Sequence, residues 1–276
     1  MKLLKELSLG AKKRYGQNFL IDERVLSKII NGAGITKDDT VLEIGPGVGT
    51  MTQALAKSAG KVIAVEIDKD LIPVLGKTLS GFDNVCVIND DILNVDIGKL
   101  TGEECRKIKV VANLPYYITT PIIMKLLEGD APIESITVMV QKEVADRMEA
   151  SPGGKDYGAL SVAVNYYTVP EIIAKVPSNC FIPRPGVDSA VINLKLRDDP
   201  RRIISGGTEI YVKDPAEMFR VVKLAFSQRR KTLVNTLKGD FEKEKILKAL
   251  KELGLGEDIR GEKLSVAEFA LLAEKL

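Results

Sequence analysis

Between about residues 40 and 141, short aliphatic and β-branched runs alternate with stretches that have helical spacing. The runs show no regular polar alternation, as is typical of strands buried on both faces of a sheet. The expected strands are Thr40–Ile44, Val62–Glu66, Val85–Ile88, Lys109–Ala112 and Ile136–Val140. The expected helices include Thr50–Ser58, Asp70–Ser80 and Thr119–Glu128. This order predicts an α/β fold with a mainly parallel sheet covered by helices on both sides.

The pattern changes after residue 141. Ser189–Leu196 alternates, which indicates an outer or antiparallel strand of the same sheet, whereas Tyr157–Val169 fits either a strand or a helix. Turn-forming residues between Asp198 and Asp214 indicate a linker. Only helical spacing follows, from Pro215 to the end. We therefore expect a first domain over residues 1–200, a linker over 201–213 and a small all-helical C-terminal domain over 214–276.

The composition is that of an ordinary soluble protein, with 45% hydrophobic and 28% charged residues among 276. No apolar run approaches the ~20 residues needed to span a bilayer. The first six residues also lack the apolar core and cleavage site of a signal peptide. Three widely spaced cysteines, Cys86, Cys105 and Cys180, favour neither a disulfide framework nor a zinc site. We expect a cytoplasmic protein without a metal.

The chain contains no histidine. This excludes every mechanism that uses an imidazole as base or metal ligand. The net charge of +2 is too small to indicate nucleic acid by itself. Its distribution is more informative, because basic residues cluster at Lys12–Arg14 and again at Arg229–Lys231.

A glycine-rich loop follows the first expected strand and runs from Glu43 through Gly45, Gly47 and Gly49. Glycines let the backbone approach a ligand closely, with the N–H groups of the next helix directed at it. The dinucleotide fingerprint is not met, because Thr50 stands where it requires glycine or alanine, and an NAD oxidoreductase is disfavoured. The pattern resembles the S-adenosylmethionine loop of the α/β methyltransferases. The alternative is a turn that needs glycine only for tight packing.

Acidic residues end the next two strands. Glu66 closes the second strand, where a carboxylate can accept hydrogen bonds from both ribose hydroxyls of an adenosine-bearing ligand. Asp91 follows the third strand and could accept the amino group of an adenine. An isolated aspartate at such a place is more often a helix cap. With the glycine loop, however, both acids fall at the carboxyl ends of successive strands, where open α/β sheets bind ligands.

The fourth strand leads into Asn113-Leu114-Pro115-Tyr116. This element resembles the catalytic motif of methyltransferases that act on exocyclic amino groups of adenine or cytosine. Such a nitrogen is a weak nucleophile because its lone pair is delocalised into the ring. The Asn113 side-chain oxygen and the Leu114 carbonyl could accept its two hydrogens and stabilise the developing positive charge. Tyr116 could stack on an extruded base. The alternative is a proline turn capped by asparagine.

Further elements support a narrower resemblance, which covers nearly the whole chain. They are Gly16–Leu20, Gln141–Met148, Tyr157–Val162, the Phe-x-Pro-x-Pro-x-Val-x-Ser element Phe181–Ser189, and Phe226–Leu233. Taken with the glycine loop and Asn113–Tyr116, they resemble the bacterial 16S ribosomal RNA adenine N6,N6-dimethyltransferase family. The resemblance implies a Rossmann-like methyltransferase domain that uses S-adenosyl-L-methionine. It also implies that Tyr157–Val169 is mainly helical.

The resemblance implies a role for particular residues. Those expected to bind the cofactor are Asn18 and the Leu20 backbone at the methionine end, Gly45 beside it, Glu66 at the ribose, Asp91 at the adenine, and Asn113. Those expected to act on the target base are Asn113 and Leu114 at the nitrogen, with Tyr116 and Phe181 stacked on either face. Lys142–Met148 is more simply explained as a structural amphipathic helix than as part of a site.

The resemblance also implies a substrate. It consists of two adjacent adenosines in a hairpin near the 3′ end of the 16S RNA, within an assembling small (30S) subunit. We accordingly expect a monomer with a role in subunit biogenesis. Arg229, Arg230 and Lys231 are expected to contact RNA phosphates, and the alternative is a solvated charged face.

Two other interpretations remain. The related erythromycin-resistance methyltransferases modify large-subunit RNA, but typically carry isoleucine at the place of Leu114 and lack the Ser227–Leu233 element. A non-catalytic assembly factor built on the same fold would not need an intact glycine loop and Asn113–Tyr116. No function can be derived for residues 201–212.

Overall fold

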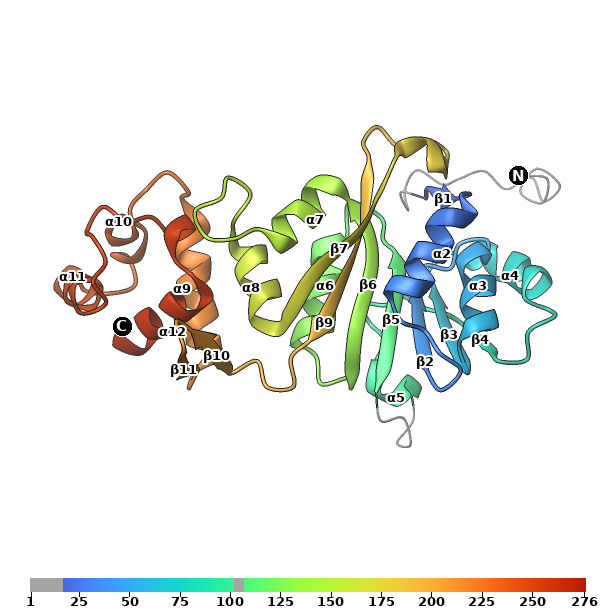
Figure 1. Cartoon of the computed structure of the whole chain (residues 1–276), viewed down its shortest axis with the longest axis horizontal. Helices are drawn as coiled ribbons and strands as arrows, with labels where there is room; N and C mark the ends of the chain where they lie inside the picture. The colour runs from blue at the N-terminus through green and yellow to red at the C-terminus, as the bar shows by residue number, and fades with distance from the viewer. Residues whose placement is uncertain (1–16, 102–106) are drawn as a thin grey trace. The chain divides into compact units, whose positions relative to one another are not determined.

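The computed structural model describes residues 17–101 and 107–276, which form two compact units (Figure 1). The first unit holds residues up to 145 together with 171–196, and the second holds residues 146–170 together with 197–276. The boundaries therefore fall inside helix α7 (Lys142–Glu149) and strand β7 (Thr168–Val176). The basic cluster Lys12–Arg14 and the residue Cys105 lie outside the described residues.

The first unit is built on a seven-stranded sheet in the order β4-β3-β2-β5-β6-β9-β7. Its other strands are β2 (Thr40–Ile44), β3 (Lys61–Glu66), β4 (Val85–Asn89), β5 (Ile108–Asn113), β6 (Ile133–Gln141) and β9 (Ser189–Leu196). Neighbours from β4 to β6 are parallel, and β9 is antiparallel to β6. The predicted α/β class with a mainly parallel sheet is confirmed.

The strand order reverses at β2. The chain passes from β2 outward to β3 and β4, and then returns to β5 on the other side of β2. Loops that leave β2 and β5 at their carboxyl ends therefore diverge, and this leaves a crevice of the kind in which open α/β sheets bind ligands. The glycine loop follows β2, and Asn113 ends β5.

Helices and short elements complete the first unit. They are β1 (Phe19–Leu20), α2 (Glu23–Gly32), α3 (Thr50–Ser58), η2 (Lys69–Leu71), α4 (Ile72–Thr78), α5 (Ile97–Thr101), α6 (Thr119–Glu128), η3 (Ser178–Cys180) and β8 (Phe181–Ile182). α3 and α6 have the predicted bounds, and the helix expected over Asp70–Ser80 is divided into η2 and α4.

One hydrophobic cluster joins the sheet to helices α2 and α3. Adjacent strands contribute one buried side chain each, and these are Val62, Val41, Val111, Met139 and Val191. The helices contribute Val25, Leu26 and Ile29 from α2, with Met51, Leu55 and Ala56 from α3. Asp22 begins α2 by accepting the N–H groups of Arg24 and Val25, as an N-cap does. The apolar runs that form β2, β3, β5 and β6 thus become the interior of the sheet, as predicted.

Three features of the sheet differ from the prediction. β4 was expected to be buried on both faces, but it is the edge strand and none of its residues is fully buried. β9 was expected to be an outer or an antiparallel strand. It is antiparallel to β6, but it lies between β6 and β7 and not at the edge of the sheet. β7 was not predicted at all. Pro170 lies in it, which fits an edge strand because proline cannot donate to a ladder.

The second unit is mainly helical. It contains α8 (Ala159–Tyr167), β10 (Arg202–Ser205), β11 (Thr208–Tyr211), α9 (Pro215–Ser227), α10 (Leu233–Leu237), α11 (Lys243–Glu252), η4 (Gly261–Lys263) and α12 (Val266–Lys275). The implied helix within Tyr157–Val169 is confirmed, as are the helices after Pro215. Residues 201–213, expected as a linker, instead contain the antiparallel hairpin β10–β11.

A core of its own holds the second unit together. Phe269 of α12 and Tyr157 are buried in it with residues from α8, α9 and α11. The Tyr157 hydroxyl donates to the Leu264 carbonyl at 2.9 Å, so the phenol is satisfied inside the core. Among the described residues, no helix is both long and apolar enough to cross a membrane.

Candidate active site

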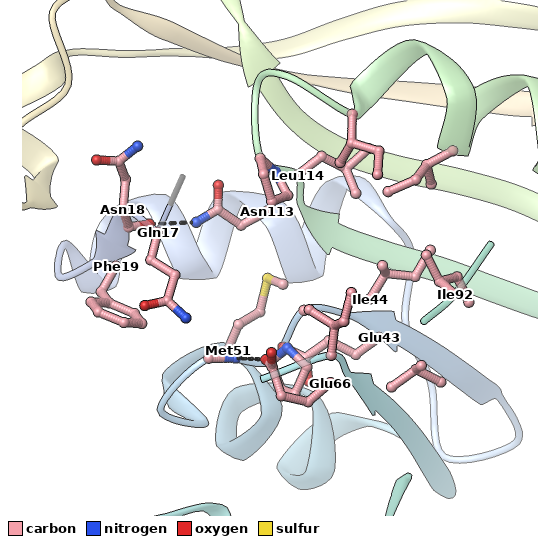
Figure 2. A pocket seen from close by; sticks show the side chains of 18 of the residues that line it. Gln17, Asn18, Phe19, Glu43, Ile44, Met51, Glu66, Ile92, Asn113 and Leu114 are labelled. Carbon is pink, nitrogen blue, oxygen red and sulfur yellow. Dashed lines mark hydrogen bonds between the residues drawn. The ribbon is translucent and has the colours of Figure 1, made fainter. Parts of the chain in front are cut away.

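A pocket lies at the carboxyl ends of β2, β3, β4 and β5 in the first unit (Figure 2). Its lining residues come from five segments: Gln17–Leu20, Glu43–Met51, Val65–Ile67, Asp90–Ile92 and Asn113–Ile122. The predicted site residues Asn18, Leu20, Gly45, Glu66, Asp91, Asn113, Leu114 and Tyr116 are all among them. Segments separated by up to a hundred residues of sequence thus meet where the strand order reverses.

The glycine loop takes a conformation that needs glycine. Gly45, Gly47 and Gly49 all have positive φ, at 68°, 60° and 89°. At Gly47 a Cβ would also approach the Phe19 ring at 3.0 Å, which is tighter than ordinary contact. α3 begins directly after Gly49, and Thr50 and Met51 at its start line the pocket. The unpaired N–H groups of this helix start are available near the ligand space.

Glu66 ends β3 and organises the loop around it. Its side chain lies in the pocket near Glu43 (Figure 2). The carboxylate accepts the Gly47 N–H at 3.0 Å on one oxygen and the Asp68 N–H at 2.8 Å on the other. Burial raises the pKa of Glu66, and these two backbone bonds oppose the rise by favouring the charged form. Each oxygen keeps a lone pair with which it can accept a hydroxyl.

Glu43 is a second acid of the pocket, and its surroundings differ from those of Glu66. The side chain is fully buried, and neither carboxylate oxygen has a hydrogen-bond partner among the described residues. Burial raises the pKa of Glu43 to about 8. The nearby Thr52 hydroxyl opposes this rise by favouring the charged Glu43 carboxylate, yet no hydrogen bond of ordinary geometry joins the hydroxyl to the carboxylate. A pocket acid without a partner fits a ligand that carries a cationic or N–H group.

Asp91 lies half-buried beyond the end of β4. One of its oxygens accepts the Leu93 N–H at 2.9 Å, so the residue does cap a turn, as the structural alternative proposed. Asp91 also lines the pocket, between Asp90 and the buried Ile92. The two roles are compatible, because the second oxygen remains available to a ligand.

Asn113 is held in one orientation at the end of β5. Its amide nitrogen donates to the Asn18 carbonyl at 2.9 Å (Figure 2). A backbone carbonyl can only accept, so the NH₂ group must face Asn18 and the side-chain oxygen is turned away from it. Leu114 follows, with its N–H bonded to the Met139 carbonyl at 3.1 Å and its side chain buried. The Pro115 carbonyl then accepts the Ile118 N–H at 3.2 Å, which closes a turn.

The two aromatic residues expected to stack on a base differ in placement. Tyr116 is half-buried and lines the pocket, and its hydroxyl lies 3.0 Å from the Ser189 hydroxyl. Phe181 is only 3% exposed and packs in the hydrophobic cluster of the sheet. It is paired with Leu20 through β8 and β1 and is not a lining residue of the pocket. The stacking role of Phe181 stays a prediction.

The three basic residues expected at RNA belong to the second unit and are not equivalent. Arg229 donates to the carbonyls of Lys155 and Tyr157 and pairs with Glu262 at 3.4 Å. The side chains of Arg230 and Lys231 are exposed, in a turn closed by the Lys231 N–H on the Gln228 carbonyl at 2.8 Å. Arg229 is thus committed within its own unit, while Arg230 and Lys231 face solvent.

Several lining residues were missed by sequence reasoning. Gln17, whose amide donates to Asp68 at 3.1 Å, and Ile67, 44% exposed beside Glu66, both line the pocket. Ile67 follows the strand-ending acid and could have been found by that position. Nothing in the sequence marked Glu43 as unpartnered. The described residues contain no group of three or more acids, cysteines or histidines placed to hold a metal ion.

Comparison with known proteins supplies the family. Residues 9–276 match the family model described as ribosomal RNA adenine dimethylase. The ribosomal RNA small subunit methyltransferase A of Lachnoclostridium phytofermentans is 57% identical over 270 residues, covering 95% of this chain and 90% of the relative. The enzyme of the same name from Clostridioides difficile is 52% identical over 265 residues, covering 95% and 89%.

Solved structures agree on the fold but do not separate the subfamilies. A dimethyladenosine transferase from Plasmodium falciparum superposes with a TM-score of 0.76 at 27% identity, covering 92% of this chain and 95% of that one. The 23S rRNA methyltransferase ErmE gives 0.69 at 28% identity, covering 94% and 99%. Because these two identities are nearly equal, the choice between a small-subunit and a large-subunit RNA methyltransferase depends on the relatives with more than 50% sequence identity. On the family model and those relatives, the chain belongs to the ribosomal RNA adenine dimethylase family.

Proposed function

We propose that this protein transfers methyl groups from S-adenosylmethionine to N6 of two adjacent adenosines in a hairpin near the 3′ end of 16S ribosomal RNA. The product is N6,N6-dimethyladenosine. The observation that carries the proposal is the orientation of Asn113, whose side-chain oxygen is turned away from Asn18 in a pocket that also contains Glu66 and Glu43. The 57% identity to a small subunit methyltransferase A supports the choice of RNA.

The pocket residues fit the cofactor. Glu43 is buried and has no hydrogen-bond partner among residues 17–101 and 107–276, which suits a ligand with an ammonium group, and Glu66 and Asp91 keep acceptor oxygens. The residues that would hold the cofactor are Asn18, the Leu20 backbone and Gly45 at the methionine end, Glu66 at the ribose, Asp91 at the adenine, and Asn113. When bound there, S-adenosylmethionine supplies an electrophilic methyl group.

The chemistry assigned to the chain begins with Asn113. The Asn18 carbonyl holds its NH₂ group, so its oxygen would accept one N6–H of the target adenine, and the Leu114 carbonyl would accept the other. Two fixed acceptors stabilise the positive charge that develops on the nitrogen. The charged product nitrogen is acidic enough to lose its proton to water, so the chemistry is compatible with a chain that has no histidine.

An adenine inside a helix or stacked loop must be extruded before its amino group can enter a pocket. Tyr116 lines the pocket and would stack on one face of the base. Phe181 would reach the other face only if its ring left the core in which it is packed. Arg229 would fix the turn that contains Arg230 and Lys231. The side chains of Arg230 and Lys231 would contact RNA phosphates.

The partner is ribosomal RNA, and we assign it to the small (30S) subunit or its precursor, with a role in subunit biogenesis. We further assign the protein to the cytoplasm as a monomer. The N6,N6-dimethyl product removes both hydrogen-bond donors from each adenine, and this alters the pairing and packing that the hairpin can make.

The test uses small subunits from cells that lack this modification, incubated with the purified protein and methyl-labelled S-adenosylmethionine, then digested to nucleosides. We expect labelled N6,N6-dimethyladenosine from the small-subunit RNA. Asn113→Ala should abolish it, whereas Asn31→Ala, at an exposed asparagine of α2, should not. In a parallel incubation with large subunits, label in the large-subunit RNA and none in the small-subunit RNA would support the ErmE-type alternative. Cofactor binding without transfer would support a non-catalytic assembly factor.

A further inference from the structure

The hydroxyl of Tyr116 makes a side-chain contact with a residue 73 positions away. It lies 3.0 Å from the Ser189 hydroxyl, and either group can be the donor. Ser189 is the first residue of β9 and is only 1% exposed. The bond therefore joins the turn after β5 to the start of an antiparallel strand two places away in the sheet.

Ser189 is held rigidly by the backbone around it. It pairs with Gln141 in the ladder between β9 and β6. The preceding residue, Asp188, is fixed on two sides: its carboxylate accepts the Ser178 N–H at 2.9 Å, and its carbonyl accepts the Lys142 N–H at 3.0 Å. A hydroxyl carried by a backbone fixed in this way is a suitable anchor for a side chain that must be positioned accurately.

Tyr116 has the greater need of an anchor. It follows Pro115 at the pocket, and it is half-buried, so packing alone does not surround its ring. An aromatic side chain turns about two torsions, and one hydrogen bond at the far end of the ring restricts both. The neighbouring Tyr117, by comparison, is 61% exposed.

We propose that Ser189 is a positioning residue for methyl transfer, which acts by fixing the Tyr116 ring on which the target adenine stacks. This rests on the proposed function. The proposal also gives the Phe181–Ser189 element a role at its serine end: the phenylalanine at the other end is buried in the core, while the serine reaches the pocket through Tyr116. A ring that tilts would move the stacked base and its amino group away from the acceptors at Asn113 and Leu114.

The test is a double-mutant cycle of Ser189→Ala and Tyr116→Phe, measured as kcat and KM for methyl transfer to unmodified small subunits. Each variant deletes one half of the bond and keeps the ring. We expect each single change to lower kcat about three- to tenfold, the range that one net hydrogen bond supports, with a smaller change in KM. The double variant should be no slower than either single one, because both remove the same bond.

Ser189→Thr keeps the hydroxyl and should restore most of kcat. The matched control is Ser135→Ala, which changes a buried serine of β6 at the far end of the same strand pair, opposite Lys195. It should leave kcat within about twofold. Affinity for S-adenosylmethionine should be unchanged in Ser189→Ala, Ser189→Thr and Ser135→Ala, since neither serine is a pocket-lining residue.

Two results would overturn the proposal. One is an active wild-type protein whose kcat is unchanged by Ser189→Ala. The other is a double variant whose loss equals the product of the single losses, which would mean that the two hydroxyls act independently. If the wild-type protein itself transfers no methyl group to small subunits, the proposed function fails instead, and the two failures are told apart by that measurement.

Discussion

Glu43 and Glu66 are neighbouring acids of one pocket, yet within the part of the chain that the structure describes only Glu66 has hydrogen bonds to its carboxylate. Glu43 is fully buried and its pKa is raised to about 8. The pKa of Glu43 is near 4.5 in the unfolded chain and higher in the folded protein. Between these two pKa values the unfolded chain loses its proton more readily, so the free energy of unfolding falls as the pH rises. A cofactor ammonium would offset this cost when bound.

Glu43→Gln should therefore raise the melting temperature of the cofactor-free protein at pH 7.5 and leave it nearly unchanged at pH 4.5. The neutral amide cannot ionise, so the variant avoids the ionisation cost that grows between these two pH values, up to about 4 kcal/mol. Thermal unfolding followed by circular dichroism between pH 4.5 and 7.5 measures the difference in melting temperature between the variant and the wild-type protein. The same change should weaken S-adenosylmethionine binding. A variant whose stability difference does not vary with pH would contradict the raised pKa.

At the scale of the element, the glycine loop joins β2 to α3 and faces both a ligand space and Phe19 of the N-terminal segment. Its positive φ values are conformations that other residues adopt only with strain. The sequence predicted that the glycines serve a ligand. The structure adds that Gly47 also lets the Phe19 ring approach, and that its N–H is bonded to Glu66.

Gly47→Ala should destabilise the protein by about 1–2 kcal/mol, because it adds strain at φ 60° and a contact at 3.0 Å with Phe19. It should also reduce cofactor affinity by displacing the loop from Glu66. Gly76→Ala is the matched control, since Gly76 is exposed in α4 and a Cβ there meets nothing within 4 Å. That change should stabilise slightly. Urea unfolding and calorimetric titration distinguish the two, and equal effects would refute the loop's role.

For the molecule as a whole, association with RNA depends on charges that face solvent. The Arg229 guanidinium binds the carbonyls of Lys155 and Tyr157 and the carboxylate of Glu262, so removing this side chain should lower the stability of the second unit. Arg230 and Lys231 are exposed, and their loss should leave stability unchanged.

We expect Arg230→Ala and Lys231→Ala each to weaken binding to small subunits and to reduce the slope of log affinity against log salt by about 1. Arg229→Ala should lower the melting temperature without a comparable change in slope. Binding titrations from low to moderate potassium chloride, with thermal unfolding alongside, give both quantities. If changing Arg230 and Lys231 together leaves affinity and its salt dependence unaltered, the charged face is only solvated.

The sequence by itself determined the class of fold, the helical C-terminal region and some of the residues that gather at the pocket, namely the glycine loop, Glu66, Asp91 and Asn113–Tyr116. Asn18 and Leu20 were assigned only through the family resemblance. Local patterns carry this information, because apolar runs mark strands that must be buried and loops after parallel strands meet at one edge of the sheet. Asn113 and Glu66 could be assigned to that edge from the sequence alone, because an apolar run leads directly into each of them and both end a strand.

Only the tertiary structure decided which distant segments meet. It placed β4 at the edge, added β7, folded residues 202–211 into a hairpin and buried Phe181 in the core. It also brought Ser189 to Tyr116 and committed Arg229 to carbonyls of its own unit. The reason is physical. The spacing of apolar residues along the chain indicates which face of a helix or strand is buried. Which segment packs on that face, and which group hydrogen-bonds to its polar atoms, depends on packing between segments that are far apart in the sequence.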